Sequence, residues 1–540
     1  MTSSHLAKLF FALCLITIAF QSQSYSTDYD KYISFHWKGA LSSHSITLKV
    51  FPLLESLEND SYNSFLVLYT KSQTSEIQNY QIISLLFEED AYPVLGVQLQ
   101  SLVPLTTYYY CFIFETESTL DGSTFNKIFS EKSYQEFSFQ TTGVALTPYN
   151  FTFGAASCAD TGSASSVFNL LKEENLGFFI HMGDLHYKNI DTNETERFYN
   201  AYYQVFSSST QKPFFQDTPI FYVWDDHDFG PNNANGNSPA KAAAHTAYKK
   251  FVPSSPLKNY LPSDDSSYGL QGAPVSNSNS DLYLPSQIGD ENGIFRSFII
   301  GRCLFIILDL RSFLEVQKGD ILGQEQMTWL ENQLRFAGYN KEIVQVFLIS
   351  SFPWIHVSKE TEWSLYETIQ QQIAKWIEKY IYKNSKELIM VSGDAHMIAL
   401  DDGSNNIFGG FPVVQAASLD RVGSCKGGPY SHGVSSGRDH YAVIQVTDYA
   451  NETICVKINL KEKNESIIAY DTCFPDLYPQ KPTSCPVGYD FEVLIWTILV
   501  GAIVVLAFLY FYKIWYQDNQ RSPGYIEMSN TEGRYRMNED

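Results

Sequence analysis

The sequence predicts a layered α/β domain, preceded by a small all-β sandwich and followed by one membrane-spanning helix. Three observations lead to this fold class. Residues 27–143 contain short β-type runs separated by turn residues, residues 149–470 alternate apolar strands with helical stretches, and the run Val493–Tyr512 has no charged residue. With 540 residues, of which 44% are hydrophobic, the chain is long enough to bury more than one core.

The two ends of the chain carry patterns typical of a secreted and anchored protein. The apolar run Leu9–Phe20 and the small polar residues after it predict a signal peptide over residues 1–24, with an uncleaved anchor or a buried helix as the alternative. The uncharged run over residues 493–512 has the length of a bilayer span. We therefore expect a single-pass membrane protein with its bulk extracellular or lumenal and residues 513–540 as a cytoplasmic tail.

Cysteines and glycosylation sequons agree with that compartment. The chain has 8 cysteines, and removal of Cys14 with the signal leaves an odd number, so at least one thiol is unpaired. Cys473 and Cys485 lie close together in the sequence and are the first disulfide we expect. Asn-x-Ser/Thr sequons predict a glycoprotein, and they begin at Asn59, Asn150, Asn193, Asn451 and Asn464.

Charge limits the classes of partner. The formal net charge is -22, so the chain repels nucleic acids at long range and nucleic-acid binding is not expected. An anionic ligand would have to be attracted by bound cations or by a few local basic residues. The tail segment Tyr525–Met528 resembles a tyrosine-based sorting signal, which predicts binding to sorting machinery.

Residues 27–143 read as one β-sandwich. β-branched and aromatic residues form the runs Ser45–Phe51, Ser64–Thr70 and Tyr80–Phe87. The stretch Leu102–Phe114 carries a Leu-x-Pro-x-Thr-x-Tyr pattern that resembles a corner of fibronectin type III domains. The region contains no cluster of catalytic residue types, so we interpret it as a packing or spacer module.

The α/β domain, residues 149–470, alternates strands and helices. The expected strands are Phe151–Ala155, Gly177–Met182, Pro219–Trp224, Cys303–Leu308, Val344–Ser350 and Glu387–Val391. The expected helices are Ser163–Glu174, Pro239–Phe251, Gln324–Phe336 and Glu362–Tyr380. A stretch rich in Ser, Pro, Asn and Gly, Ser254–Pro285, interrupts the alternation and reads as a long surface insertion near the mouth of the site.

Chemically active residues follow most of these strands. They stand in the blocks Ser157-Cys158, Gly183–Tyr187, Asp225–Asp228, Asp309–Arg311 and Gly393–His396. The carboxyl ends of strands are where open α/β sheets build their sites, so we expect these blocks to meet at one edge. Several carboxylates placed there together repel each other, and a bound metal is the simplest compensation.

From about Tyr149 to Leu460, the chain resembles the alkaline phosphatase D (PhoD-like) family of calcineurin-like metallophosphoesterases. The resemblance rests on Ser157-Cys158, Gly183–Tyr187, Trp224–Asp228, Leu308–Ser312, Leu322–Leu330 and Ser392–His396. It implies a metallophosphoesterase domain, built as a layered β-sandwich with helices outside, that hydrolyses phosphate mono- or diesters. Two positions depart from the wider pattern: Cys158 stands where an Asp-x-His block is common, and Asp228 stands where many relatives have Glu.

The resemblance also implies a site for two metal ions. It places Cys158, Asp184, Tyr187 and His396 around one ion, and this mixture of donors suits a transition ion, with ferric iron favoured by the Tyr ligand. Asp184 would bridge to a second ion held by Asp226 and Asp394, an all-oxygen set that suits Ca²⁺, with Mg²⁺, Mn²⁺ or Zn²⁺ as alternatives. For Cys158 the other interpretation is a disulfide or a buried thiol.

Two further residues are candidates for catalysis. His227 is the candidate for protonating the leaving oxygen or stabilising the transition state, and Arg311 is the candidate for binding a phosphate oxygen in a fork. For Arg311 a structural salt bridge is an equal alternative. For the whole chain, the alternative function is a catalytically silent receptor or adhesion ectodomain on a phosphoesterase fold.

Overall fold

The computed structural model describes residues 28–53, 63–87, 92–115, 134–253, 293–355, 363–451, 453–483, 485 and 491–519. The chain divides into two units, Met1–Cys485 and Pro486–Asp540. The predicted signal peptide, the insertion Ser254–Pro285, the sequon at Asn59 and the tail from residue 520 lie outside the described residues. Glycosylation at the other sequons stays a prediction.

Two large sheets form the frame of the first unit. One has nine strands in the order β20 (Glu465–Asp471), β19 (Ile454–Glu462), β18 (His440–Asp448), β8 (Phe151–Ala156), β9 (Phe178–Met182), β10 (Ile220–Val223), β1 (Ile33–Gly39), β2 (Ile46–Pro52) and β5 (Leu95–Leu99). The other has seven, in the order β11 (Arg296–Ile300), β12 (Cys303–Ile307), β13 (Gln345–Ser350), β14 (Glu387–Ser392), β16 (Val413–Ala416), β15 (Met397–Asp401) and β17 (Val434–Ser436).

The two sheets pack face to face through aromatic side chains. The ring of Phe153 on β8 lies 5.4 Å from that of Phe305 on β12 and 5.2 Å from that of Phe347 on β13, centroid to centroid. Edge-to-face pairs of this kind contribute about 0.5–1.5 kcal/mol each beyond the area they bury. Strands β9, β12 and β13 are buried along their whole length, which explains their continuous apolar sequences.

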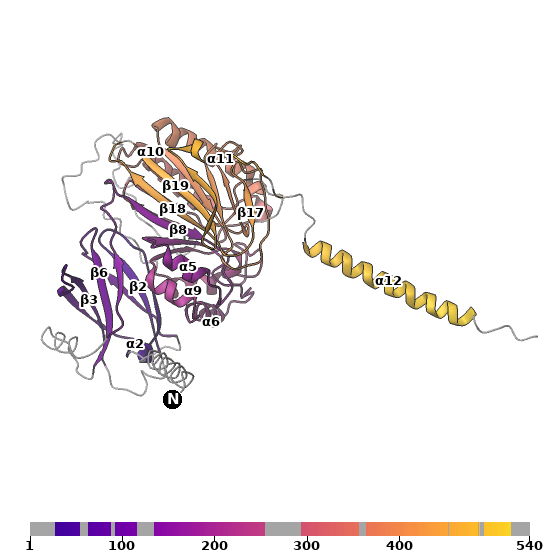
Figure 1. Ribbon diagram of the computed structural model, residues 1–540, viewed down its shortest axis with the longest axis horizontal. Helices are drawn as coiled ribbons and strands as arrows, with labels where there is room; N and C mark the ends of the chain where they lie inside the picture. The colour runs from indigo at the N-terminus through magenta and orange to yellow at the C-terminus, as the bar shows by residue number, and fades with distance from the viewer. Residues whose placement is uncertain are drawn as a thin grey trace, which may run out of the picture. The chain divides into compact units, whose positions relative to one another are not determined.

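Helices cover the outer face of each sheet, as expected for a layered α/β sandwich (Figure 1). On the nine-stranded sheet these are α5 (Val167–Glu173), α6 (Thr195–Phe206), α7 (Gln211–Asp217) and α9 (Lys241–Phe251). On the seven-stranded sheet they are α10 (Gly323–Tyr339) and α11 (Glu367–Trp376). The single helix expected over Glu362–Tyr380 is instead a 3₁₀ turn, α11 and a π-helical turn in succession.

The N-terminal strands share a sheet with the α/β part. A four-stranded sheet, β4 (Ile77–Leu85), β3 (Asn63–Lys71), β6 (Thr107–Glu115) and β7 (Phe137–Gln140), faces β1, where His36 Nε2 lies 2.8 Å from the hydroxyl of Tyr110 on β6. Strand β1 in turn pairs in parallel with β10 at Gly39 and Ile220. A Cβ on Gly39 would lie 2.3 Å from the Ile220 carbonyl oxygen, so a glycine is required where the two parts join.

The expected membrane span is wrong. Within the described part of the chain, no helix is both long enough and apolar enough to cross a bilayer. The helix of the second unit is α12 (Phe491–Asn519). The span over residues 493–512, which completed the predicted fold class, and the single-pass localisation are both corrected by this finding.

The disulfides also differ from the prediction. Cys425 bonds to Cys485 and Cys455 bonds to Cys473, so the expected Cys473–Cys485 bond is wrong. Cys455 lies on β19 and Cys473 follows β20, and the antiparallel pairing of these strands brings the two thiols together. Proximity in the sequence was therefore a poor guide. The free cysteines among the described residues are all buried: Cys111, Cys158 and Cys303.

Candidate metal centre and active site

The blocks that follow the strands converge at one end of the facing sheets. Strands β8, β9 and β10 are adjacent and parallel, so the residues after them, Cys158, Asp184 and Asp226, emerge side by side. Asp394 and His396 follow β14 of the other sheet, which is parallel to β13. The arrangement of the strands thus brings together residues that are far apart in the sequence.

Several of these residues have left-handed backbones. The φ angles are +63° for Cys158, +54° for Asp184, +60° for Asp394 and +49° for His396. A non-glycine residue in this region costs free energy, and such residues cluster at functional sites where their surroundings hold them in place. Gly183 also has positive φ, and a Cβ there would lie 2.4 Å from Cβ of Asp225, so the turn into Asp184 requires a glycine.

One group of ligand atoms surrounds Cys158. Cys158, Asp184 and His396 each offer a ligand atom, and these atoms all lie within 4.8 Å of one another. The Tyr187 hydroxyl donates to Asp184 Oδ2 at 2.7 Å and lies 3.1 Å from His396 Nε2. His396 Nδ1 donates to the Val422 carbonyl at 2.8 Å, which leaves the lone pair of Nε2 directed into the group. All four predicted ligands of the first ion therefore lie together.

A second group shares Asp184. Asp184, Asp226 and His227 also offer ligand atoms within 4.8 Å of one another, so Asp184 has the position of a bridging ligand. His227 was predicted as a proton donor and not as a ligand. Its Nδ1 contacts the Asn189 side-chain oxygen, and its Nε2 lies 4.0 Å from Asp226 Oδ2. When Nδ1 donates to Asn189, the neutral ring presents Nε2 as a lone pair that suits a cation.

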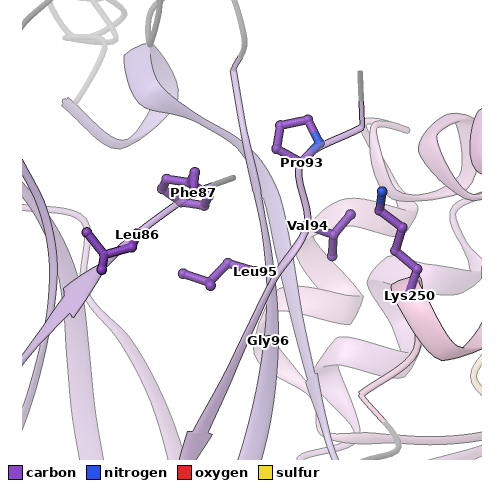
Figure 2. A pocket seen from close by; sticks show the side chains of 7 residues that line it. All are labelled: Leu86, Phe87, Pro93, Val94, Leu95, Gly96 and Lys250. Atoms are coloured by element: carbon purple, nitrogen blue, oxygen red, sulfur yellow. The ribbon is translucent and has the colours of Figure 1, made fainter. Parts of the chain in front are cut away.

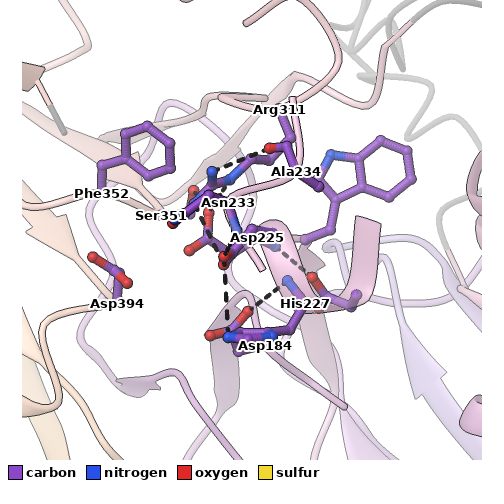
Figure 3. Close-up of polar contacts among 12 residues, drawn as sticks. Asp184, Asp225, His227, Asn233, Ala234, Arg311, Ser351, Phe352 and Asp394 are labelled. Carbon is purple, nitrogen blue, oxygen red and sulfur yellow. Dashed lines mark hydrogen bonds and ion pairs between the residues drawn. The ribbon is translucent and has the colours of Figure 1, made fainter. Parts of the chain in front are cut away.

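Asp394 belongs to neither of these two groups, although its charge contributes, after burial and the charge of Asp184, to raising the pKa of Cys158. Lys426 Nζ contacts Asp394 Oδ2 at 2.8 Å, and the Asp394 amide donates to Ser157 Oγ at 3.2 Å. Figure 3 shows Asp394 across from the network that joins Asp184, Asp225 and His227. The structure thus brings Asp184 and Asp226 together. Asp394, the third predicted ligand of the second ion, forms an ion pair with Lys426.

Arg311 is a buried ion-pair partner. Its side chain is 1% exposed, with Nε donating to Asp225 Oδ1 at 2.7 Å, Nη1 donating to the Ala234 carbonyl at 3.2 Å and Nη2 lying 3.4 Å from Asp226 Oδ1 (Figure 3). The guanidinium also lies 4.1 Å above the centre of the Phe352 ring. All three nitrogens are engaged by protein groups, so the geometry favours the structural salt bridge over a direct phosphate contact.

The charges at the site call for a cation. Burial raises the pKa of Asp184 well above its usual value, and the nearby charges of Asp226 and Asp225 raise it further. Burial and the Asp184 charge likewise raise the pKa of the Cys158 thiol. These groups are costly to ionise together in the protein alone, whereas a bound cation stabilises the carboxylate and thiolate forms that serve as ligands. The residues present therefore fit a metal centre.

Sequence reasoning missed two cations beside the site, Arg421 and Lys426. The Arg421 guanidinium lies 3.9 Å above the Tyr187 ring centre, while the His227 ring is 4.1 Å from the Tyr187 ring. Both cations lie on the loop of residues 417–433 between β16 and β17. The signal that could have found this loop is the strand-like run Phe411–Ala417, which is apolar except for Gln415 and is followed by polar residues like the other strands of the domain.

A pocket of about 440 Å³ lies elsewhere, beside β5 (Figure 2). Its lining is mostly apolar and includes one cation, Lys250, but no acid, cysteine or histidine that could hold a metal. The described residues that line it are Leu86, Phe87, Pro93, Val94, Leu95, Gly96 and Lys250. We therefore place the chemistry at Asp184 and not in this pocket.

Comparisons with known proteins identify one family model and solved structures that are similar to this chain. Residues 153–418 match the family model for the PhoD-like phosphatase. The solved structure of PhoD matches with a TM-score of 0.56 at 15% identity, covering 86% of this chain and 95% of that chain. Purple acid phosphatase PPD1 from yellow lupin (Lupinus luteus) seeds has a TM-score of 0.49 at 12% identity, covering 85% and 77% of the two chains. No curated protein matches the sequence.

Proposed function

Residues 153–418 form a PhoD-like phosphatase domain, and we propose that it hydrolyses phosphate esters with two cations bound on either side of Asp184. The family and the class of phosphoric ester hydrolase, both expected from the sequence, are confirmed by the family match. The observation that carries the proposal is the shared position of Asp184. Its carboxylate belongs to both groups of ligand atoms, as a bridging ligand must.

The two groups differ in chemistry and suit different ions. Cys158, Tyr187 and His396 supply sulfur, phenol oxygen and imidazole nitrogen, and we propose Fe(III) there. Asp226 supplies oxygen, with His227 beside it, and we propose Ca(II) at this second position, with Mg(II), Mn(II) or Zn(II) as alternatives. Bound cations of this kind neutralise charge on phosphoryl oxygens and lower the pKa of water.

The surrounding residues hold the site in place. Val422 fixes the ring of His396 through its carbonyl, and Asn189 fixes the ring of His227. Arg311 holds Asp225 and Asp226 in a buried ion pair. For His227 to protonate a leaving oxygen, Nε2 must carry a proton. Burial lowers the pKa of His227, so this form is minor at neutral pH and the role of cation ligand is favoured.

The test uses the purified full chain and compares Asp184→Ala with Asp476→Ala, which removes an exposed carboxylate outside the site. Hydrolysis of a chromogenic phosphomonoester and of the matching diester is measured, with bound metals determined by elemental analysis. We expect wild type and Asp476→Ala to bind metal and turn over. Asp184→Ala should lose about 10³-fold or more in kcat, because the substitution removes a carboxylate ligand that both proposed cations share. Wild-type protein with neither metal nor turnover would instead favour the silent receptor.

Partners follow from the same chemistry. A phosphate ester is the proposed substrate, and the net charge of -22 keeps nucleic-acid binding outside the proposal. The predicted sorting segment at Tyr525 lies outside the described residues and stays a prediction.

A further inference from the structure

The site needs an accessible positive charge for the phosphate of a substrate, and the predicted arginine does not provide it. Arg311 is 1% exposed and uses its nitrogens on Asp225, Asp226 and Ala234. The protein is strongly acidic, so long-range attraction is also absent. Arg421 and Lys426, with side chains 35% and 23% exposed, are the cations of the 417–433 loop that lie against site residues.

Arg421 has the geometry of an anion-binding group. Its guanidinium stacks on the Tyr187 ring, whose hydroxyl contacts both Asp184 and His396. Its Nη1 pairs with Asp160, and its Nε is buried without a hydrogen bond among the described residues. The guanidinium is therefore anchored by Asp160, its flat face is fixed on the Tyr187 ring beside the metal-binding group, and the partly exposed remainder of its charge faces solvent next to the site.

The 417–433 loop is tied to the ligands it accompanies. The Ser424 amide donates to the His396 carbonyl at 3.0 Å, and the Val422 carbonyl accepts from His396 Nδ1 at 2.8 Å. The Cys425–Cys485 disulfide fixes the loop between Arg421 and Lys426 covalently. Both cations are thus placed before any substrate arrives, which reduces the entropy cost of binding.

We propose that Arg421 binds the phosphoryl group of the substrate and, with Lys426, selects phosphomonoesters over diesters. This inference rests on the proposed phosphatase function. A guanidinium can make a two-point contact with the free oxygens of a phosphate, of which a monoester has three and a diester two. A monoester also carries about -1.5 to -2 charges at neutral pH, more than a diester, and so gains more from two cations.

The experiment compares three variants of the metal-loaded full chain. Arg421→Met removes the charge and keeps much of the side-chain length, Arg421→Lys keeps the charge without the fork, and Arg335→Met is the matched control. Arg335 is an exposed arginine on α10 whose Nη2 donates to Asn332 Oδ1 at 2.9 Å. The readouts are kcat/KM for a phosphomonoester and its matching diester, and the Kd of orthophosphate measured by calorimetry. Thermal unfolding and metal content check that each variant is intact.

We expect Arg421→Met to weaken orthophosphate binding and lower monoester kcat/KM by about 10- to 100-fold, the range for loss of a charge-assisted hydrogen bond. The diester should be affected several-fold less, Arg421→Lys should fall between, and Arg335→Met should match wild type. Orthophosphate Kd within twofold of wild type in an intact, metal-loaded Arg421→Met protein overturns the inference, as do equal losses for both esters. Wild type that hydrolyses neither ester refutes the proposed function, and the orthophosphate measurement then still decides the role of Arg421.

Discussion

Removal of the Cys425–Cys485 disulfide tests how the 417–433 loop is held. The bond closes a loop with a sequence separation of 60 residues, for which the chain-entropy relation gives about 4 kcal/mol of stabilisation. The Cys455–Cys473 bond has a separation of 18 residues, which by the same relation gives about 3 kcal/mol. Double Ser variants of the two bonds should therefore lose similar stability in urea unfolding.

Their effects on catalysis should differ. Only the 417–433 loop carries Arg421 and the Val422 carbonyl that orients His396, so loss of Cys425–Cys485 should lower kcat/KM about 10-fold or more. Loss of Cys455–Cys473 should leave kcat/KM near wild type at temperatures where the variant is folded, because that bond joins β19 to the end of β20. Equal kcat/KM in the two folded variants would refute the argument that the Cys425–Cys485 disulfide holds the 417–433 loop in position.

Two further predictions concern buried single residues. Burial lowers the pKa of Lys38 to about 7, below its unfolded value of 10.5, so the unfolded chain binds more protons between these values and stability should rise with pH from about 7 to 10.5. Lys38→Met should remove that slope and stabilise the protein near pH 7, as measured by urea unfolding across pH; an unchanged slope contradicts the assignment. Cys158→Ser should reduce bound metal by about one ion per chain, whereas Cys303→Ser, at another buried free cysteine, should not. Elemental analysis distinguishes them, and equal metal content in both variants would remove Cys158 from the ligand set.

The sequence predicted the site well where a residue directly follows a strand. Cys158, Asp184 and Asp226 meet because three parallel strands end together, a rule that needs only the order of apolar runs. Arg421 was missed because its importance comes from stacking on Tyr187, a residue distant in the chain. The role of Arg311 was left open because a sequence does not show which acids surround a buried guanidinium.

The errors in the fold have similar causes. The membrane span was predicted because residues 493–512 form an uncharged apolar run of the length that crosses a bilayer. Within the described residues, however, no helix is both long enough and apolar enough to do so. Pairing Cys473 with Cys485 used distance along the chain, whereas the β19–β20 register decided the bond. The partition of the helical stretch after Trp363 into 3₁₀, α and π turns depends on packing against α10 that no local pattern encodes.

The pairing of β1 with β10 has a consequence for dissecting this protein. A fragment that begins near residue 149 would lose β1, β2 and β5 and leave one side of β10 without its neighbour. Unpaired backbone donors and acceptors on such an exposed edge are a template for association with other chains. The N-terminal strands therefore act as a cover for the sheet that bears the metal ligands, and a soluble phosphatase fragment must retain them.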